Sequence, residues 1–374
     1  MNTLKRHFDV TLTLLAPLHI GTGRELLRDY DYVTRHGQTW FLAPDVLLDT
    51  FVDEQGNFVD DILGRPAEEL LKEADFRPDN PIFRYVIPGQ PRAQGHGAVL
   101  REQIKDAFGR PYLPGSSLKG ALRTVLAWHG YRQMPQAKLN VGAMRGNRSW
   151  AAQETERTLF GRSPNYDLLR MIQVADSEPL PISALQLVNA QVVTKAKEPG
   201  SPIECEALQR NKRWETPEIH TSISVDLALR TQAAAQQLGF GDRVDWVDEL
   251  PAIAREWARA RLAAERAWFA QRNDTPIVQL YTQMEGLLKS DKLGSNRFFL
   301  QLGWGGGWGS KTIGLLLQED DREWQRLLKD RRLSPARIRR RDGDAFPKSR
   351  RVMMLRDRPV APFGWCLVEI NERI

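Results

Sequence analysis

The chain has 374 residues, of which 41% are hydrophobic and 27% charged, and its formal net charge is +6. This hydrophobic share allows a large buried core, yet no apolar run approaches the ~18 residues that a membrane span needs. Cys205 and Cys366 are too few for a disulfide framework. We therefore expect a soluble cytoplasmic protein with no membrane partner.

The first part of the chain predicts β-structure. Between Phe8 and Leu15 apolar and polar residues alternate, which is typical of a half-buried strand and not of a signal peptide. The sequence HIGTG, residues 19–23, ends this strand with two glycines. Residues 30–42 predict further strand, and residues 43–111 form a less regular, proline-containing region.

The sequence YLPGSSLKGALRTVL predicts a capped amphipathic helix. Ser116 or Ser117 can cap it, and apolar residues recur at helical spacing from Leu118 onward. Lys119 and Arg123 lie four residues apart on another face. Free amides, the positive end of the helix dipole and two cations make a candidate anion site. The alternative is an ordinary capped helix whose basic side chains are solvated.

The second half mixes strands and helices. Residues 203–209 and 219–229 predict strands, and a long helix rich in Ala and Arg follows from Ala252. The sequence RFFLQLGWGGGWGSKTIGLLL predicts a strand, a glycine loop and a helix, and residues 365–370 predict a closing strand. Because the elements do not alternate as regular βαβ units, the predicted fold class is α+β.

Basic residues concentrate near the C-terminus. Residues 331–358 contain eleven Lys or Arg and only three Asp. Such segregation favours a polyanionic partner, and the preference for Arg over Lys favours forked contacts to phosphate. Arg350 and Arg351 are the candidate contacts in this segment. The alternative is a surface stretch that serves solubility.

Motifs of common enzymes are absent from the sequence. The six His residues form no H-E-x-x-H pair or zinc pattern, and the chain has neither a P-loop nor a G-x-S-x-G elbow. We therefore predict no metal and no cofactor.

Three glycine-rich loops, HIGTG, LPGSSLKG and GWGGGWGSKTIG, instead point to phosphate binding. Glycine allows a backbone to approach phosphate closely and to direct amides at it, so the loops predict a groove that follows a nucleic-acid backbone. Trp304 and Trp308 either stack on bases or belong to the core. The candidate contacts from the first and third loops are His19, Gly21, Gly23, Gly305, Gly307, Trp308, Ser310 and Lys311.

An ordered set of segments carries a family resemblance: PLHIGTG, RDYDYV, YLPGSSLKGALR, LFGR, MIQVADSEPL, the late glycine loop, FPKSRRVM and RPVAPFGW. The set resembles the RAMP superfamily of CRISPR-associated proteins. It is similar, over nearly the whole chain, to the subunit that caps the crRNA 3′ end in type III-A, or Csm, effector complexes. The late loop departs from the superfamily's usual G-x-G-x5-G. Gly305, Gly307 and Gly314 leave six intervening residues, whereas Gly307, Gly309 and Gly314 leave four.

The resemblance implies a ferredoxin-like, RRM-type core with a second related domain and insertions. The expected N-terminal domain covers residues 1–180, with an insertion at about 43–111. The expected C-terminal domain covers residues 181–374, with a helical insertion at about 230–290 and the glycine loop at 303–314.

The resemblance also implies a non-catalytic subunit that binds crRNA at its 3′ end and contributes to crRNA maturation and antiviral defence. In that setting Ser116, Ser117, Lys119 and Arg123 are expected to contact the crRNA backbone. Backbone RAMP subunits of the Csm complex, the small helical subunit and host trimming nucleases are the expected further partners. The chain lacks the RRM aromatic signature, so sequence-independent binding is expected.

The alternative hypothesis is an endoribonuclease. Backbone RAMP subunits cut target RNA with an aspartate after the HIG segment, and Asp31 lies in the comparable place. His19 is the second catalytic candidate, because related processing nucleases use a histidine as general acid or base.

Overall fold

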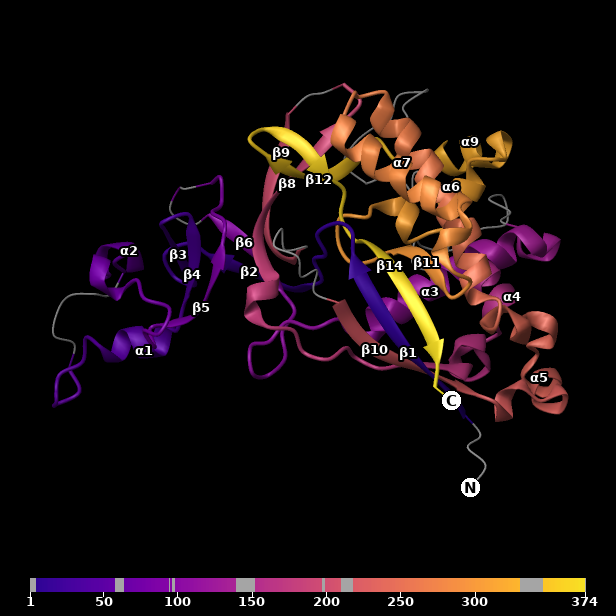
Figure 1. Ribbon diagram of the computed structural model, residues 1–374, viewed down its shortest axis with the longest axis horizontal. Helices are drawn as coiled ribbons and strands as arrows, with labels where there is room; N and C mark the ends of the chain where they lie inside the picture. The colour runs from indigo at the N-terminus through magenta and orange to yellow at the C-terminus, as the bar shows by residue number, and fades with distance from the viewer. Residues whose placement is uncertain are drawn as a thin grey trace.

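The computed structural model describes residues 5–57, 64–93, 95, 98–138, 152–196, 199–209, 218–329 and 346–373 (Figure 1). Its strands are β1 (Lys5–Leu14), β2 (Gly21–Leu27), β3 (Tyr32–Arg35), β4 (Gln38–Leu42), β5 (Phe83–Pro88), β6 (Val99–Gln103), β7 (Ile172–Val174), β8 (Leu185–Thr194), β9 (Pro199–Leu208), β10 (Glu218–Asp226), β11 (Arg297–Gln301), β12 (Ser349–Leu355), β13 (Arg358–Ala361) and β14 (Trp365–Glu372). Its α-helices are α1 (Pro44–Asp49), α2 (Ala67–Leu70), α3 (Gly115–Gln133), α4 (Gln153–Phe160), α5 (Gln232–Leu238), α6 (Leu250–Ala270), α7 (Thr275–Lys289), α8 (Gly314–Leu317) and α9 (Asp321–Lys329).

A five-stranded antiparallel sheet forms the centre of the larger body, with the order β11-β14-β1-β10-β7. Helix α3 follows β1 in the chain and α6 follows β10, so the order β14-β1-β10-β7 with its two helices is ferredoxin-like. This confirms the predicted α+β class and the ferredoxin-like core.

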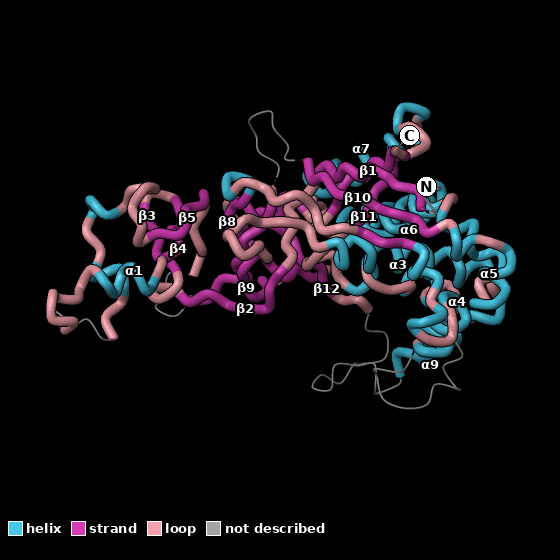
Figure 2. The backbone as a smooth tube through the Cα atoms, turned by 90° about the horizontal axis from the view of Figure 1, so that it is seen from below, coloured by secondary structure: helices cyan, strands magenta, loops and turns pink. Residues whose placement is uncertain are grey.

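Helices α3 and α6 contact each other and cover one face of this sheet (Figure 2). The predicted stripe of α3 is confirmed, because Leu118, Leu122, Val125 and Leu126 are buried. Burying a side chain of this size contributes about 1.5–3 kcal/mol, so the stripe holds α3 on the sheet. The region expected as a helical insertion, residues 230–290, includes α6, which packs on the central sheet. Only part of this region is therefore additional to the ferredoxin-like core.

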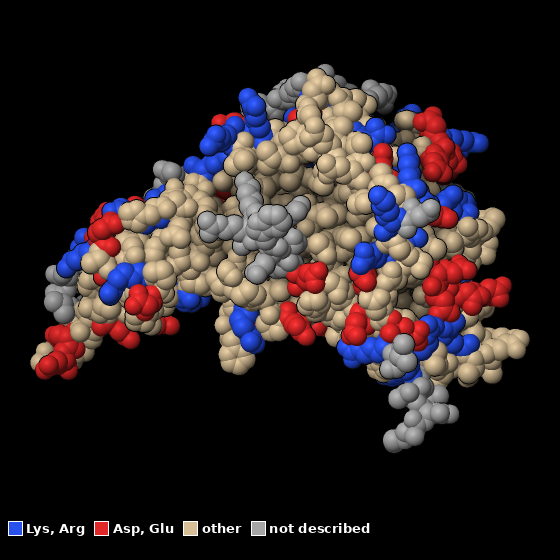
Figure 3. All heavy atoms as spheres, in the orientation of Figure 1, with Lys and Arg blue, Asp and Glu red and all other residues tan. Residues whose placement is uncertain are grey.

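The opposite face of the sheet is polar. In β1 the outward residues are His7, Asp9, Thr11 and Thr13, and in β10 they are Glu218, His220, Ser222 and Ser224. Figure 3 shows acidic side chains gathered over the lower part of this side of the molecule, near β1, β10 and β14. These two central strands therefore offer no Phe, Tyr or Trp on this face on which bases could stack.

A second sheet, with the order β13-β12-β8-β9-β6-β2, contains one parallel pair, β6 with β9. The third sheet, β3-β4-β5, forms with α1 and α2 a lobe that projects to one side (Figure 1). The lobe has its own small core around Trp40, Leu42 and Phe83. It overlaps the expected insertion at 43–111 but begins earlier, at β3.

The predicted boundary near residue 180 stays a prediction. Each of the two larger sheets takes strands from both sides of that residue: β1, β7 and β10 lie in one sheet, and β2, β6 and β8 in the other. Within the described part of the chain, no helix has the length and apolar character needed to cross a membrane.

Candidate nucleic-acid interface

A groove of about 700 Å³ lies where the three predicted glycine loops meet. We call it the glycine groove. The sequence-predicted residues that line it are His19, Gly21, Gly23, Ser116, Ser117, Ser310 and Lys311. The groove is also lined by Arg24, Arg101, Gly303 and Trp304. Arg101 belongs to none of the sequence motifs. Segments distant in sequence thus form one site.

His19 forms part of the wall of the glycine groove and is 1% exposed. Its Nδ1 lies 2.7 Å from the backbone oxygen of Glu206, and since a carbonyl can only accept, Nδ1 carries the proton and Nε2 is an acceptor. Burial lowers the pKa of His19 to about 4, so the ring is neutral near pH 7. A Cβ at Gly21 would lie 2.9 Å from Nε2, so glycine leaves this nitrogen uncrowded.

The turn that carries His19 is fixed by a buried polar network around Glu206, which is 0% exposed. Glu206 accepts hydrogen bonds from the Tyr85 hydroxyl at 2.8 Å, the Gln103 amide at 2.8 Å and Lys105 Nζ at 2.5 Å. The Gln103 side chain in turn accepts from the Ile20 amide at 2.9 Å. The network ties β9, β6 and the lobe to the HIGTG loop.

The late glycine loop docks on the same turn. The Trp304 amide donates to the backbone oxygen of His19 at 2.8 Å, and Gly303 has φ +67°. A Cβ at Gly303 would lie 2.4 Å from that same oxygen, so this close approach requires glycine. The two loops therefore form a single wall of the groove.

Trp304 packs within this wall. Its ring lies edge-on to His19, with centroids 5.8 Å apart, and edge-on to Phe363 at 5.3 Å. The guanidinium carbons of Arg101 and Arg351 each lie 5.1 Å from its ring centre, which is cation–π distance. Trp304 therefore holds two arginines in place beside the glycine groove.

Helix α3 begins at Gly115, two or three residues earlier than a cap at Ser116 or Ser117 predicts, and its capping differs from the prediction. Pro114 occupies the N-cap position, and no side chain caps the helix. The Gly115 amide instead donates to Asp176 at 2.7 Å, so a distant carboxylate satisfies one of the first free amides. Ser116 and Ser117 lie inside the first turn and line the groove, which makes their predicted capping role wrong.

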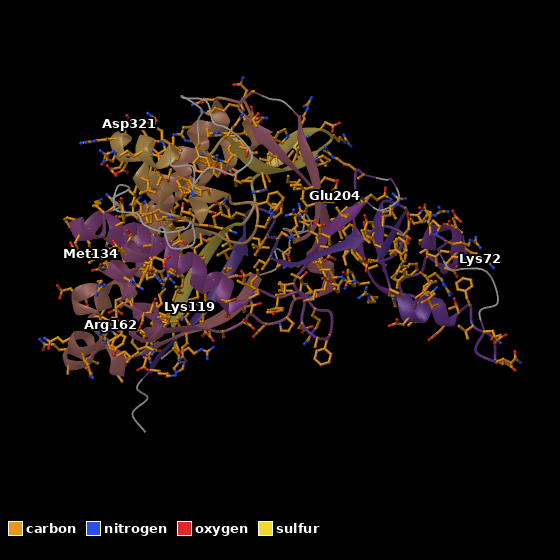
Figure 4. The ribbon with its side chains drawn as sticks, turned by 180° about the vertical axis from the view of Figure 1, so that it is seen from behind. Lys72, Lys119, Met134, Arg162, Glu204 and Asp321 are labelled. Atoms are coloured by element: carbon orange, nitrogen blue, oxygen red, sulfur yellow. The ribbon has the colours of Figure 1, made fainter. Side chains whose placement is uncertain are left out.

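Lys119 and Arg123 do not line the groove. Lys119 Nζ donates to the backbone oxygen of Ile172 at 2.7 Å, and burial lowers its pKa. Arg123 pairs with Asp167 at 2.7 Å and lies over the Phe160 ring at 4.0 Å. Figure 4 shows Lys119 in the first part of α3. Both cations are thus used within the fold, and their predicted RNA contact stays a prediction.

The other predicted contacts lie near the groove or beyond it. Gly305 packs against the Phe363 side chain, which a Cβ would approach to 2.6 Å, and Gly307 has φ +75°. Trp308 packs on Trp324 and Phe346, with ring centres 5.7 and 4.9 Å away. Arg350 pairs with buried Glu265 at 2.8 Å. Residues 330–345, which include much of the basic C-terminal segment, lie outside the described residues.

The glycine groove is lined by charged side chains of both signs, with Arg24, Arg101 and Lys311 beside Glu25 and Glu102. Arg101 and Lys311 make no ion pair within the described part of the chain. Arg24 is paired with Asp31 at 2.6 Å, and the Leu27 amide also donates to Asp31 at 2.9 Å. Asp31 therefore holds a turn and does not line the groove. The described residues contain no cluster of three side chains suited to a metal ion.

We expect Lys119→Ala to destabilise the fold by about 1.5–3 kcal/mol, because the charged hydrogen bond to Ile172 is lost. Leu122→Ala is expected to cost about 2–5 kcal/mol, since Leu122 is 1% exposed. Urea unfolding measures both, with the exposed Lys289→Ala as control. If Lys119→Ala matched the control, the hydrogen bond would contribute nothing and Lys119 would be free for RNA.

Comparison with known proteins places these features in a family. A model of the RAMP superfamily matches residues 11–310. A protein of Streptococcus thermophilus named CRISPR system Cms protein Csm5 is 32% identical over 141 residues, which cover 32% of this chain and 38% of that protein. The protein of the same name from Mycobacterium tuberculosis is 27% identical over 75% of this chain and 82% of its own length.

The fold agrees with these sequence matches. A chain in the cryo-EM structure of a Csm-crRNA-target RNA ternary complex, from a type III-A CRISPR-Cas system, superposes with a TM-score of 0.71. It is 25% identical, and the match covers 97% of this chain and 100% of that chain. The resemblance inferred from the ordered sequence segments is confirmed: the chain belongs to the RAMP superfamily.

Proposed function

We propose that this chain is a non-catalytic subunit of a type III-A Csm effector complex and that its glycine groove holds the 3′ end of the crRNA. The observation that carries the proposal is the convergence of three glycine loops with Arg101 and Lys311. The similar proteins named Csm5 and the similar chain of a Csm-crRNA-target RNA complex support the setting. Contributions to crRNA maturation and antiviral defence follow from this role.

The groove suits a sugar-phosphate backbone better than a particular base sequence. Glycines at its wall allow close approach of phosphates, and Arg101 and Lys311 are the cations proposed to contact them, on a wall that also carries Glu25 and Glu102. His19 adds a means of distinguishing RNA from DNA. Its Nε2 is a hydrogen-bond acceptor. It therefore suits a ribose 2′-hydroxyl, which can donate a hydrogen bond, and not an ionised phosphate oxygen, which can only accept one.

Protein partners belong to the same proposal. A subunit that ends a filament needs one complementary surface and must block further addition on the other. Backbone RAMP subunits are the proposed neighbours. The small helical subunit and host trimming nucleases are the proposed further partners. The lobe of β3, β4 and β5, which carries Lys72 in Figure 4, projects from one side of the molecule, so the two sides present different surfaces to neighbouring subunits.

We expect the double reversal Arg101→Glu with Lys311→Glu to weaken binding of single-stranded RNA by more than tenfold. Each lost phosphate contact should also flatten the slope of log K against log [salt] by about 0.7. Fluorescence anisotropy with labelled single-stranded RNA measures both quantities. Lys289→Glu with Lys292→Glu is the matched control, because these exposed residues lie outside the groove. An equal loss in both variants would show that only total charge matters.

A second function, RNA cleavage, is favoured by one observation. The unprotonated Nε2 of His19 borders the groove at neutral pH, which is the form that a general base needs, but a pKa of about 4 makes it a weak base. Incubation of the protein with labelled repeat RNA, in EDTA and in Mg²⁺, separates the two functions. Intact, retained RNA supports the binding subunit. Discrete products that vanish in His19→Gln or Asp31→Asn would establish the nuclease.

A further inference from the structure

A second groove, of about 570 Å³, lies on the other side of the late glycine loop. We call it the tryptophan groove and define it by Lys195, Arg261, Trp268, Trp308, Lys348 and Arg350. Helix α6 supplies its floor, because residues 261, 264, 268 and 271 follow helical spacing along one face. The small side chain of Ala264 leaves room above this face. The volume lies within the ~300–1,000 Å³ of ordinary ligand sites.

Among the residues that the structure describes, the tryptophan groove is lined by Lys and Arg and by no Asp or Glu. Lys195 and Lys348 are exposed and make no ion pair in the part of the chain that the structure describes. Glu265 lies buried beneath the groove and is shared by Arg261 and Arg350, each at 2.8 Å. One carboxylate therefore balances only one of these two arginines, and the site has an excess of positive charge.

Arg261 adds an unused donor. Its side chain is 2% exposed, and its terminal nitrogens donate to Glu265 at 2.8 Å and to Gln301 at 3.0 Å. Its Nε–H has no partner in the structure. A buried donor that remains unsatisfied costs about 1–3 kcal/mol, more when it is charged, and an anionic ligand is one way to recover that energy.

Aromatic rings line the same groove. Trp308, Trp324 and Phe346 form a cluster with ring centres 4.9–6.1 Å apart, and all three border the groove. Trp308 is half-buried, so part of its ring remains accessible. Trp268 lies beneath the Arg350 guanidinium at 4.8 Å. Cations beside aromatic rings are the combination that proteins use to hold single-stranded nucleic acid, with stacked bases and paired phosphates.

The late glycine loop joins the two grooves. Gly303, Trp304, Ser310 and Lys311 border the glycine groove, whereas Trp308 and Gly309 border the tryptophan groove. The two sites therefore share one loop, whose residues border one groove or the other.

We propose that the tryptophan groove is a second subsite for single-stranded RNA, in which a base stacks on the aromatic cluster and Lys195, Lys348 and Arg350 contact phosphate. The proposal rests on the proposed function, because the strand in this subsite continues from the glycine groove across residues 303–311. The proposed occupant is RNA, because each nucleotide supplies both a phosphate for the lysines and a planar base for the aromatic cluster.

The test compares three charge-reversal pairs in the full chain by anisotropy with labelled oligouridylate. We expect Lys195→Glu with Lys348→Glu to weaken binding by about tenfold and to flatten the salt dependence. Both lysines are exposed, so folding should be unaffected. The matched control is Lys289→Glu with Lys292→Glu. Two further single variants test the aromatic cluster. Trp308→Leu should lose affinity for oligouridylate, and Trp308→Phe should retain most of that affinity.

The outcomes separate this proposal from the first. If the Arg101 and Lys311 pair weakens binding while the Lys195 and Lys348 pair behaves as the control, the second subsite is wrong and the glycine groove stands. If neither pair differs from the control, both proposals are wrong. Displacement of RNA from this subsite by polyglutamate at equal affinity would identify a protein ligand instead. Uridine monophosphate binding as tightly as the oligonucleotide would identify a free nucleotide and overturn the continuous strand.

Discussion

Glu206→Ala is expected to lower the free energy of unfolding by about 3–5 kcal/mol, because it removes one partner of a buried ion pair. Lys105, with a side chain 8% exposed, would lose its carboxylate at 2.5 Å. The Tyr85 hydroxyl and the Gln103 amide would also lose their acceptor. Urea unfolding followed by far-UV circular dichroism measures the change.

The same substitution should weaken RNA binding even where the protein remains folded. Gln103 positions the Ile20 amide, so losing the network frees the turn that carries His19. Glu218→Ala is the matched control, since Glu218 is an exposed strand residue on the polar face of the first sheet. A loss of stability no larger than that of Glu218→Ala would mean that water replaces the network at little cost.

Glu204→Gln, unlike Glu206→Ala, is expected to raise the free energy of unfolding at alkaline pH. Glu204 lies two residues before Glu206, on the same face of β9, and is 3% exposed. One of its carboxylate oxygens accepts from the Arg92 amide at 3.0 Å, and the other is buried without a partner. Burial raises the pKa of Glu204 to about 7. The side-chain amide of glutamine still has an oxygen that can accept the hydrogen bond from the Arg92 amide, and it has no charge to bury.

The sign of the pH dependence follows from that raised pKa. Below about pH 4.5 the carboxyl is protonated in both the folded and the unfolded chain, and the variant should match the wild type. Between about pH 4.5 and 7 the unfolded wild type releases the proton of Glu204 while the folded wild type keeps it, and above about pH 7 the folded wild type carries a buried charge. The wild type then loses up to about 3 kcal/mol, and the variant should exceed its stability by about that amount at pH 8.

Thermal or urea unfolding at pH 4, 6 and 8 tests this dependence. His19, whose lowered pKa acts in the opposite direction between about pH 6.5 and 4, is present in both proteins and cancels in their difference. A difference that stays constant from pH 4 to 8, or a variant less stable at pH 8, would show that Glu204 is not an ionising buried carboxyl.

Local periodicity made part of the fold predictable. The alternation in β1 and the apolar stripe of α3 each depend on neighbours within a few residues, and both are confirmed. The glycine loops were predictable as turns, and their binding of phosphate stays a prediction. The three loops together predicted one groove, but the residues that meet in it depend on pairings across the chain, such as Trp304 with His19, which spacing does not give.

The remaining part of the site depends on non-local contacts that no motif marks. Arg101 is a single residue of a short strand, and the parallel pairing of β6 with β9 places it beside Cys205, more than a hundred positions away. The same limit explains Lys119 and Arg123. Helical spacing correctly placed them off the apolar stripe, but it could not show that Ile172 and Asp167 lie opposite them.

The most direct test of the central claim is photo-crosslinking of the full chain to single-stranded RNA that carries 4-thiouridine, with the crosslinked peptides identified by mass spectrometry. The account predicts crosslinks in peptides that contain residues 19–21, 23 and 24, Ser116 and Ser117, or Lys311, all of which border the glycine groove. Loss of these crosslinks in the Arg101→Glu and Lys311→Glu variant would strengthen the assignment. Crosslinks confined to β1, β10 and β14, the strands of the polar sheet face, would contradict it.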